Sequence, residues 1–409
     1  MNKPTLPMAY LVSRYPAISH TFILREIQGL RALDHQIFTA SINPPDRTND
    51  TMEDYERKEA EATFFVKAQG VQGALSALLY WLLKSPLAML STLRLGLTLG
   101  KGGSWFYGLA YAVEAAIVAR WMQGLGLVQL HVHFGNAGAS VGVLVKHLSR
   151  CHLSYTIHGP DEFDDVPGQN LPLKMAYADR VMCISQFAKG QLMRISRPAH
   201  WRKFQVCRLG VDPTHFSYTA PHALSSTVKL LCVGRLSSAK AQLVLVQACA
   251  GLRDEGLDFS LRLVGDGPDR AAIEKSIADL DLTDYVHLSG ALNQTAVRAH
   301  FRSADIFVLP SLAEGIPVVL MEAMSSGVPC VSTPVNGIPE LIQHGRTGLL
   351  ATPGDVISLR DQLRLLIQQP ELRRSLAEAA RLKVLADFDL RRNVAQLSHS
   401  FSSFDVVEA

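Results

Sequence analysis

Short apolar runs alternate with stretches of helical spacing along most of the chain. In the first half the runs lie at 8–12, 35–42, 128–134, 153–159 and 180–185. In the second half they lie at 228–234, 259–265, 285–290, 305–310 and 328–333. Continuous apolar strands separated by helices are typical of parallel sheets that helices cover on both faces. The pattern predicts an α/β protein whose ligands bind beyond the carboxyl ends of its strands.

The length of the chain predicts more than one domain. A chain of 409 residues exceeds the size at which a single core stops growing. A polar stretch with a proline, residues 217–227, separates two halves that both resemble covered sheets. We therefore expect an N-terminal domain over 1–216 and a C-terminal domain over 217–385. Residues 386–409 are expected to form a terminal helix that packs back on the first domain.

Composition and charge exclude some classes of protein. Hydrophobic residues make up 48% and charged residues 19%, which is typical of a globular chain. A net charge of +3 gives no reason to expect nucleic-acid binding. The cysteines form no Cys-x-x-Cys pair, and we expect them to be small buried hydrophobes in a reducing cytosol. The N-terminus lacks the apolar core of a secretory signal, so a cytoplasmic protein is predicted.

One apolar segment, residues 71–100, leaves two interpretations open. Lys84, Pro86 and Arg94 interrupt it, so it is too broken to span a bilayer. It can form a pair of helices packed on the domain core. Alternatively, it presents an apolar surface that rests on a membrane, in which case charged residues in place of Trp81 and Leu82 should release the protein from vesicles.

The second half carries a turn suited to an anion. In VGRLSSAK (233–240), Gly234 follows a strand, and Arg235 and Lys240 flank the start of a helix. Two cations beside backbone amides at such a turn suit a diphosphate. A solvated turn with ordinary surface cations is the alternative. The turn LVGDGPDR (263–270), with Gly265, is a weaker signal of the same kind.

The strongest signal is PSLAEGIPVVLMEAM (310–324). Glu314 lies in a loop after a strand, Pro317 is expected in the first turn of a helix, and Glu322 lies inside that helix. The amides of Gly315, Ile316 and Val318 lie at its positive end. Carboxylates accept hydrogen bonds from sugar hydroxyls, and amides and cations bind a diphosphate. Surface acids that favour the helix dipole are the alternative, but the apolar neighbours argue against it.

At these residues the sequence resembles the family-4 retaining glycosyltransferases, which have the GT-B fold. The pattern of that family is an arginine and a lysine after the first strand of the C-terminal domain, then two glutamates separated by seven residues. Arg235, Lys240, Glu314 and Glu322 match it. The resemblance covers essentially the whole chain. It implies two Rossmann-like domains whose parallel sheets face each other across a cleft.

The resemblance also implies roles for these residues. Arg235 and Lys240 would hold the diphosphate of a uridine or guanosine diphosphate sugar. Glu314 would contact the transferred sugar, Glu322 the ribose, and the backbone of 316–318 would follow the sugar and phosphate. The transfer would retain the anomeric configuration and need no metal or other cofactor. The sequence departs from the family where Ala241 and Gln242 replace a usual glycine, and where SRYPAISHTFI (13–23) replaces a glycine pair.

The first half is expected to bind the acceptor. Its opening resembles enzymes of colanic-acid-type exopolysaccharide assembly, and Ser13 and His20 would face the cleft. Ser19 is the expected cap of the following helix. His158 in TIHGPDEF (156–163) matches the family histidine that approaches the transferred sugar, and Asp161 is a candidate for acceptor hydroxyls. A loop histidine bonded to backbone is the alternative for His158.

A second pair of histidines lies on one strand. His131 and His133 in HVHFGNAGAS (131–140) are on the same side of the strand because side chains alternate. No cysteine or carboxylate cluster near them in the sequence completes a metal site, so no metal is assigned. We expect them to shape the cleft, with His133 near the acceptor.

Three functions follow from these patterns. The leading one is a cytoplasmic glycosyltransferase that extends a lipid-linked saccharide at the inner membrane face. A second is a GT-B nucleotide-sugar epimerase, which would need several acid–base carboxylates around the sugar. A third is a non-catalytic subunit that binds a partner transferase, against which the intact Arg235, Lys240, Glu314 and Glu322 argue.

Overall fold

The chain divides into two compact units. The computed structural model describes residues 6–17, 20–48, 52–216, 218 and 227–402. Unit 1 comprises residues 1–207 and 394–409, and unit 2 comprises residues 208–393. The sequence had placed these divisions after residues 216 and 385. Most of the polar stretch 217–227, and Ser19, lie outside the described residues.

Unit 1 is built on a parallel sheet of seven strands in the order β3-β2-β1-β4-β5-β6-β7. The strands are β1 (Met8–Arg14), β2 (Ile37–Asn43), β3 (Phe64–Phe65), β4 (Gln129–His133), β5 (His152–Ile157), β6 (Arg180–Cys183) and β7 (Phe204–Val206). The strand order reverses between β1 and β4. In doubly wound sheets such a reversal leaves a crevice at the carboxyl ends of the two strands.

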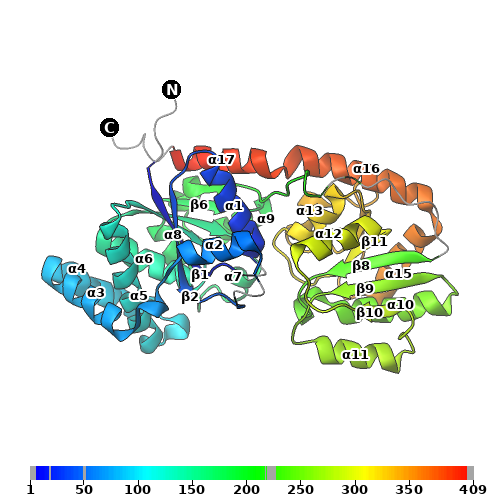
Figure 1. The fold of residues 1–409 in the computed structure, drawn as a ribbon, viewed down its shortest axis with the longest axis horizontal. Coiled ribbons are helices and arrows are strands. Elements are labelled where there is room, and N and C mark those ends of the chain that lie inside the picture. Colours follow the sequence, from blue (N-terminus) through cyan, green and yellow to red (C-terminus); the bar gives the residue numbers. More distant parts are fainter. Residues whose placement is uncertain (1–5, 18–19, 49–51, 217, 219–226, 403–409) are drawn as a thin grey trace. The chain divides into compact units, whose positions relative to one another are not determined.

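The helices of unit 1 follow the strands in chain order. They are α1 (Thr21–Arg31), α2 (Asp54–Ala62), α3 (Gly70–Lys84), α4 (Pro86–Leu99), α5 (Trp105–Gly124), α6 (Ala137–Ser149), α7 (Asp161–Asp164), α8 (Leu171–Tyr177) and α9 (Gln186–Ile195). Short 3₁₀ turns cover Lys67–Gln69, Lys101–Gly103 and Pro198–Lys203. Figure 1 shows α3, α4 and α5 stacked beside α6 within this unit.

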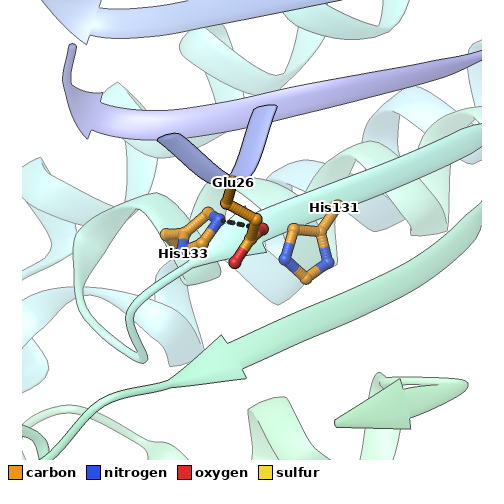
Figure 2. A group of neighbouring side chains, drawn as sticks. All are labelled: Glu26, His131 and His133. Carbon is orange, nitrogen blue, oxygen red and sulfur yellow. Dashed lines mark ion pairs between the residues drawn. The ribbon is translucent and has the colours of Figure 1, made fainter. Parts of the chain in front are cut away.

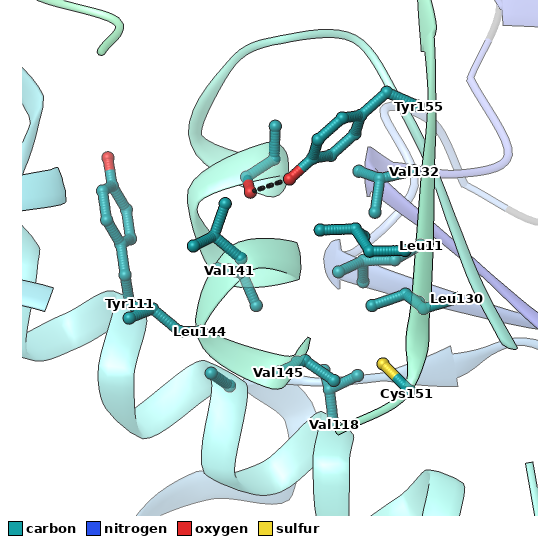
Figure 3. Close-up of a cluster of buried hydrophobic side chains, with 14 of the residues drawn as sticks. Leu11, Tyr111, Val118, Leu130, Val132, Val141, Leu144, Val145, Cys151 and Tyr155 are labelled. Carbon is teal, nitrogen blue, oxygen red and sulfur yellow. Dashed lines mark hydrogen bonds between the residues drawn. The ribbon is translucent and has the colours of Figure 1, made fainter. Parts of the chain in front are cut away.

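Helix α6 lies between the sheet and a second helical layer. It packs on β1, β4 and β5 on one side and on α4 and α5 on the other. Val141, Leu144 and Val145 of α6 are fully buried in this arrangement, as Figure 3 shows. Asn136 caps the helix by accepting a hydrogen bond from the Gly138 N–H at 3.0 Å. The cap fixes where the chain turns from β4 into α6, at the edge where the histidines lie.

Helices α3 and α4 bury one face and expose the other. Trp81 and Met89 are buried in the core of unit 1, and the Trp81 indole donates a hydrogen bond to the Ala116 carbonyl at 3.1 Å. Gly96 lets α4 approach α5 closely, because a Cβ there would lie 2.7 Å from the carbonyl oxygen of Gly108. The expectation of a helix pair packed on the core is confirmed. Among the described residues, no helix combines the length and hydropathy needed to cross a membrane.

Unit 2 is built on a second parallel sheet, with strand order β10-β9-β8-β11-β12-β13. Its strands are β8 (Val228–Val233), β9 (Phe259–Val264), β10 (Val286–Leu288), β11 (Ile306–Leu309), β12 (Cys330–Ser332) and β13 (Leu349–Leu350). Its helices are α10 (Gln242–Asp254), α11 (Arg270–Asp279), α12 (Gln294–Ser303), α13 (Val318–Ser325), α14 (Ile338–Leu341), α15 (Val356–Gln368) and α16 (Pro370–Asp387), with a 3₁₀ turn at Ser238–Lys240. Here the order reverses between β8 and β11. The predicted α/β class and Rossmann-like architecture are confirmed for both units.

The last described helix, α17 (Leu390–Ser402), passes from unit 2 into unit 1. Its residues in unit 1 pack against the sheet of that unit. Phe401 is 1% exposed, and its ring centroid lies 5.1 Å from that of His131. Ser398 hydrogen-bonds Nε2 of His35 at 2.7 Å. All six cysteines are buried and free, as predicted.

Candidate active site

The turn after β8 is held against the turn after β9. A Cβ at Gly265 would lie 1.9 Å from the carbonyl oxygen of Gly234, and the φ of Gly265 is 142°. Only glycine fits such a position. The Leu236 N–H also donates to the Asp266 carbonyl at 3.0 Å. Gly234 and Gly265, both identified from the sequence, therefore contact each other and hold the two turns together.

A buried amide holds the same turn from below. Gln242 is 1% exposed, and its Nε2 donates to the Arg235 carbonyl at 3.0 Å. Its Oε1 accepts a hydrogen bond from the Ser237 N–H at 3.4 Å. Gln242 thus ties the backbone on both sides of Leu236. The sequence showed this residue only as a departure from the family pattern.

Lys240 and Glu314 meet at the point where the strand order reverses. The Lys240 ammonium and the Glu314 Oε1 form an ion pair, and the Ser311 hydroxyl donates to the same oxygen at 2.7 Å. The Leu312 N–H donates to the Ala239 carbonyl at 2.8 Å, which joins the two loops. Glu314 is 6% exposed. The pair therefore lies partly desolvated at the carboxyl ends of β8 and β11.

The start of α13 presents backbone donors beside this pair. Pro317 takes the N-cap position and α13 begins at Val318, with Glu322 buried inside it. The sequence had placed Pro317 in the first helical turn, whereas in the structure it lies just before that turn. The N–H groups of Gly315, Ile316 and Val318 form no backbone hydrogen bond with the described residues. Such amides at a helix N-terminus are ready to bind an anion.

Arg235 is placed differently from Lys240. Its side chain is exposed, and its guanidinium forms no hydrogen bond or ion pair with any residue that the structure describes. Lys240 is paired with a carboxylate, whereas Arg235 has its full donor set available for a ligand.

In unit 1, His158 lies just beyond β5 and is 5% exposed. Its Nε2 hydrogen-bonds Nδ1 of His133 at 3.0 Å, and its ring centroid lies 4.5 Å from that of Phe134. Burial, followed by the neighbouring histidines His133, His20 and His131, holds its pKa well below the usual range. The imidazole is therefore neutral at physiological pH.

The backbone of His158 is fixed by a carboxylate that the sequence did not single out. Glu162 is buried, and its Oε2 accepts hydrogen bonds from the N–H groups of His158, at 2.8 Å, and Gly159. Its Oε1 accepts from the Gly135 N–H at 2.5 Å. Burial raises the pKa of Glu162 to about 7, while these three donors oppose the shift. Glu162 thereby joins the loops after β4 and β5, whereas Asp161 beside it is exposed.

The other predicted residues of unit 1 lie around the same edge. The Ser13 hydroxyl donates to Asn136 Oδ1 at 2.8 Å, so it supports the cap of α6. His20 is half-buried, its ring centroid lies 4.9 Å from that of Phe134, and burial lowers its pKa. His133 is fully buried and contacts His158, and its role near the acceptor stays a prediction.

Figure 2 shows a carboxylate between the two histidines of β4. Glu26 of α1, His131 and His133 offer ligand atoms within 4.8 Å of one another. Both ring nitrogens of His131 already contact hydroxyls, Ser154 at 2.8 Å and Thr156 at 3.0 Å. Three ligands are enough to hold a metal ion, but both ring nitrogens of His131 already have hydrogen-bond partners. The absence of a metal stays a prediction.

Comparison with known proteins identifies the family. The family described as glycosyl transferases group 1 matches residues 221–383. The amylovoran biosynthesis glycosyltransferase AmsK of Erwinia amylovora is 30% identical over 407 residues, which cover 96% of this chain and 98% of that protein. The chain belongs to the group 1 glycosyltransferases. WcaL of Salmonella typhimurium, assigned to colanic acid biosynthesis, is 28% identical over 408 residues, with coverage of 96% and 99%.

Solved structures show the fold of this glycosyltransferase. Anabaena HepE, solved in complex with UDP and glucose, matches with a TM-score of 0.74 at 18% identity, over 97% of this chain and 100% of that chain. Sucrose-phosphate synthase of Thermosynechococcus elongatus matches with a TM-score of 0.77 at 18% identity, over 98% and 100%. The glycosyltransferase therefore has the predicted GT-B fold, with one Rossmann-like sheet in each unit.

The candidate residues of the glycosyltransferase form two groups, one in each unit. The group in unit 2 lies within the matched range and is held together by the Gly234–Gly265 contact and the Lys240–Glu314 ion pair. The group in unit 1 centres on His158. Sequence reasoning missed the side chains that hold these groups in place, which are Gln242, Ser311, Glu162 and Glu26.

Proposed function

We propose that this glycosyltransferase moves a sugar from a uridine or guanosine diphosphate donor to a lipid-linked saccharide, in the assembly of an exopolysaccharide. The observation that carries the proposal is the Lys240–Glu314 pair where the strand order of unit 2 reverses, beside unpaired amides at the start of α13. The names of the relatives AmsK and WcaL support a role in exopolysaccharide biosynthesis.

Each group has a role that its chemistry supports. Negative charge grows on the diphosphate as the sugar departs, and Arg235, Lys240 and the amides of 315–318 lower the barrier by meeting that charge. Glu314 accepts hydrogen bonds from hydroxyls of the sugar, and Glu322 from those of the ribose. Because Arg235, Lys240 and the amides of 315–318 would stabilise the charge on the diphosphate, the proposed reaction needs no metal.

We also propose a retaining mechanism of the family-4 type. The leaving phosphate takes the proton of the acceptor hydroxyl on the face from which it departs, so the new bond keeps the anomeric configuration. No carboxylate nucleophile is needed on the opposite face. His158 would contact the transferred sugar from unit 1, and Ser13, His20 and Asp161 are the candidate contacts to the acceptor.

Calorimetry with a panel of uridine and guanosine diphosphate sugars tests the donor site. One donor class should bind the wild type, and Arg235→Ala should weaken that binding at least about tenfold, because a charge-assisted contact to phosphate is lost. Arg374→Ala is the matched control, since Arg374 is an exposed arginine on α16 that pairs with Glu371. Equal losses in both variants would contradict the proposed site.

Two outcomes favour the alternatives. Conversion of the donor sugar to its epimer, without transfer, would identify an epimerase. A well-folded wild type that binds no nucleotide sugar would leave the non-catalytic subunit as the better description. Nuclear magnetic resonance of the product anomer then tests retention.

Contact with a membrane is the second part of the proposal. The outer face of α3 and α4 exposes leucines, among them Leu83 at 77% and Leu87 at 81%. Trp105, Phe106 and Tyr107 are also exposed where α5 begins. An apolar helix face of this kind, next to aromatic side chains, is suited to the interface of a bilayer.

The charge around this face favours an anionic lipid surface. Between Glu61 and Asp161 the sequence contains a single acidic residue, Glu114. The basic residues in the same interval are Lys67, Lys84, Arg94, Lys101, Arg120, Lys146 and Arg150. A basic, apolar surface is attracted to anionic headgroups and would place the acceptor domain at the inner face of the cytoplasmic membrane.

Flotation with vesicles of phosphatidylcholine, with and without phosphatidylglycerol, tests this contact. The wild type should float with anionic vesicles. Leu83→Glu combined with Leu87→Glu should reduce binding about 100-fold, because two exposed leucines that would enter the bilayer are lost. Leu382→Glu changes an equally exposed leucine on α16 and should bind as the wild type. Trp81, the residue first chosen from the sequence, is unsuitable because it is buried. A wild type that binds no vesicle, or that self-associates through this face, would overturn the contact.

A further inference from the structure

Three buried side chains, Tyr10, Glu26 and His133, lead from the interior of unit 1 to His158. The Tyr10 hydroxyl donates to Glu26 Oε1 at 2.9 Å. The same oxygen lies 3.3 Å from Nε2 of His133, and Nδ1 of His133 lies 3.0 Å from Nε2 of His158. Figure 2 shows the Glu26 carboxylate directed between the rings of β4. His133 therefore connects a buried carboxylate to the proposed sugar-contacting histidine.

The carboxylate decides which nitrogen of His133 carries a proton. The contact between Glu26 and Nε2 of His133 has the distance of an ion pair without hydrogen-bond geometry, and Nε2 has no other partner among the described residues. A lone pair on Nε2 would face the negative carboxylate in a dry interior, where the repulsion is poorly screened. An N–H at that position is attracted instead.

The position of this proton sets the tautomer of the next ring. When His133 carries a single ring proton and that proton is on Nε2, its Nδ1 is an acceptor. The 3.0 Å contact then needs a donor on the other ring, so Nε2 of His158 carries its proton. Nδ1 of His158 is left as a hydrogen-bond acceptor.

We propose that Glu26 and His133 are positioning residues that hold His158 as the Nε2–H tautomer, so that its Nδ1 accepts a hydrogen bond from a hydroxyl of the substrate. This inference rests on the proposed function of His158. The rings of Phe134 and Phe22 flank the imidazole, with centroids 4.5 and 5.0 Å away, and Glu162 fixes its backbone. The ring is thus fixed in place by these contacts, and its tautomer is selected by Glu26 through His133.

The tautomer can be measured without any substrate. Long-range proton–nitrogen correlation spectra of the full chain labelled with ¹⁵N-histidine distinguish protonated from unprotonated ring nitrogens, and His158→Gln assigns the signals of His158. In the wild type, Nε2 of His158 should carry the proton. In Glu26→Leu the proton of His133 should move to Nδ1, which inverts the tautomer of His158. Glu26→Asp should restore the wild-type pattern.

A matched control separates this effect from general damage to the core. Ser154→Ala removes a hydrogen bond of similar burial from His131, which does not contact His158 through a hydrogen bond. This variant should keep the wild-type tautomer. Inversion in Ser154→Ala as well, or an Nδ1–H tautomer in the wild type, would overturn the proposal. So would a stoichiometric metal in the purified protein bound by Glu26, His131 and His133.

Kinetics provide a second readout. Glu26→Leu should lower kcat for transfer by about 10- to 100-fold, the range seen when outer partners that orient a functional histidine are removed. Binding of the nucleotide sugar to unit 2 should be unchanged, so KM for the donor stays close to that of the wild type. A wild type that binds no nucleotide sugar would refute the proposed function. The tautomer of His158 would still be tested by the nitrogen spectra, which need no substrate.

Discussion

Ala241 holds a backbone conformation that most side chains avoid. Its φ is 52° and its ψ 37°, in the left-handed region, and it is buried at the N-cap of α10. Left-handed backbone costs an alanine about 1 to 2 kcal/mol. The resemblance to the family implied a glycine soon after Lys240, where Ala241 and Gln242 stand. A glycine would adopt the conformation of Ala241 without strain, so the alanine adopts it at a cost to stability.

Replacement of Ala241 by glycine should stabilise unit 2. The relief of backbone strain exceeds the extra entropy that glycine loses on folding, so Ala241→Gly should raise the free energy of unfolding by about 0.5 to 1 kcal/mol. Denaturant unfolding measures the change. Gly265→Ala is the control of opposite sign, because its new Cβ would collide with the Gly234 carbonyl. A loss of stability in Ala241→Gly would show that the left-handed turn is not strained.

Gln242 should affect the affinity for the nucleotide sugar, because it holds the backbone turn that carries Arg235. Gln242→Glu keeps the shape of the side chain but cannot donate to the Arg235 carbonyl. We expect binding of the nucleotide sugar to weaken about tenfold, since Arg235 and its neighbours lose their fixed backbone. Calorimetry checks this, with Gln191→Glu on α9 of unit 1 as the control. Unchanged binding would make Gln242 a residue of stability alone.

Some residues of the candidate site could be predicted from their position after a strand, whereas others depend on tertiary packing that the sequence does not show. His158 directly follows β5, and Lys240 and Glu314 lie in the loops after β8 and β11, so their place at the carboxyl ends of the strands could be predicted. Glu26 could not be linked to His133, because only the packing of α1 on β4 brings them together. Glu162 was part of a quoted motif, but its three backbone contacts depend on how the loops after β4 and β5 fold.

At the scale of elements, the predicted strands are those that lie within apolar runs of the sequence, whatever the length of the strand itself. Every apolar run identified from the sequence overlaps a strand of the structure. Three further strands, β3, β7 and β13, have two or three residues, and each is an edge strand of its sheet. These three strands lie outside the apolar runs identified from the sequence and are formed by pairing with a neighbouring strand.

Helix α5 carries a carboxylate whose protonation should affect the stability of the helical layer. Burial raises the pKa of Glu114 to about 7. A raised carboxyl pKa gives stability that is full below the unfolded value of 4.5 and is lost as the pH rises through 7. Ionisation of Glu114 therefore opposes folding at neutral and alkaline pH.

Glu114→Gln should remove this dependence. Its stabilisation relative to the wild type should grow by about 2 to 3 kcal/mol between pH 5 and pH 8, because each unit of pKa shift corresponds to about 1.4 kcal/mol. Urea unfolding at both values measures it. Glu61→Gln, at an exposed position of α2, should show the same dependence of the free energy of unfolding on pH as the wild type. A constant difference for Glu114→Gln would mean that the carboxyl is solvated.

At the scale of the molecule, the C-terminal helix completes the core of unit 1. Phe401 packs on the rings of Tyr10 and His131, with centroids 6.3 and 5.1 Å away. Phe401→Ala should lower the stability of unit 1 by about 3 to 5 kcal/mol, the usual cost of truncating a buried phenylalanine. Thermal unfolding should show an earlier transition for unit 1. Leu382→Ala, an exposed truncation on α16, should change stability by less than about 0.5 kcal/mol.

Unit 1 is therefore made of two pieces that the ribosome produces at different times. Residues 208–393 are synthesised between them, which takes about 10 to 40 s at about 5 to 20 residues per second. During that interval the rings of Tyr10 and His131 lack the packing of Phe401. The core of unit 1 is thus completed only after unit 2 has been synthesised.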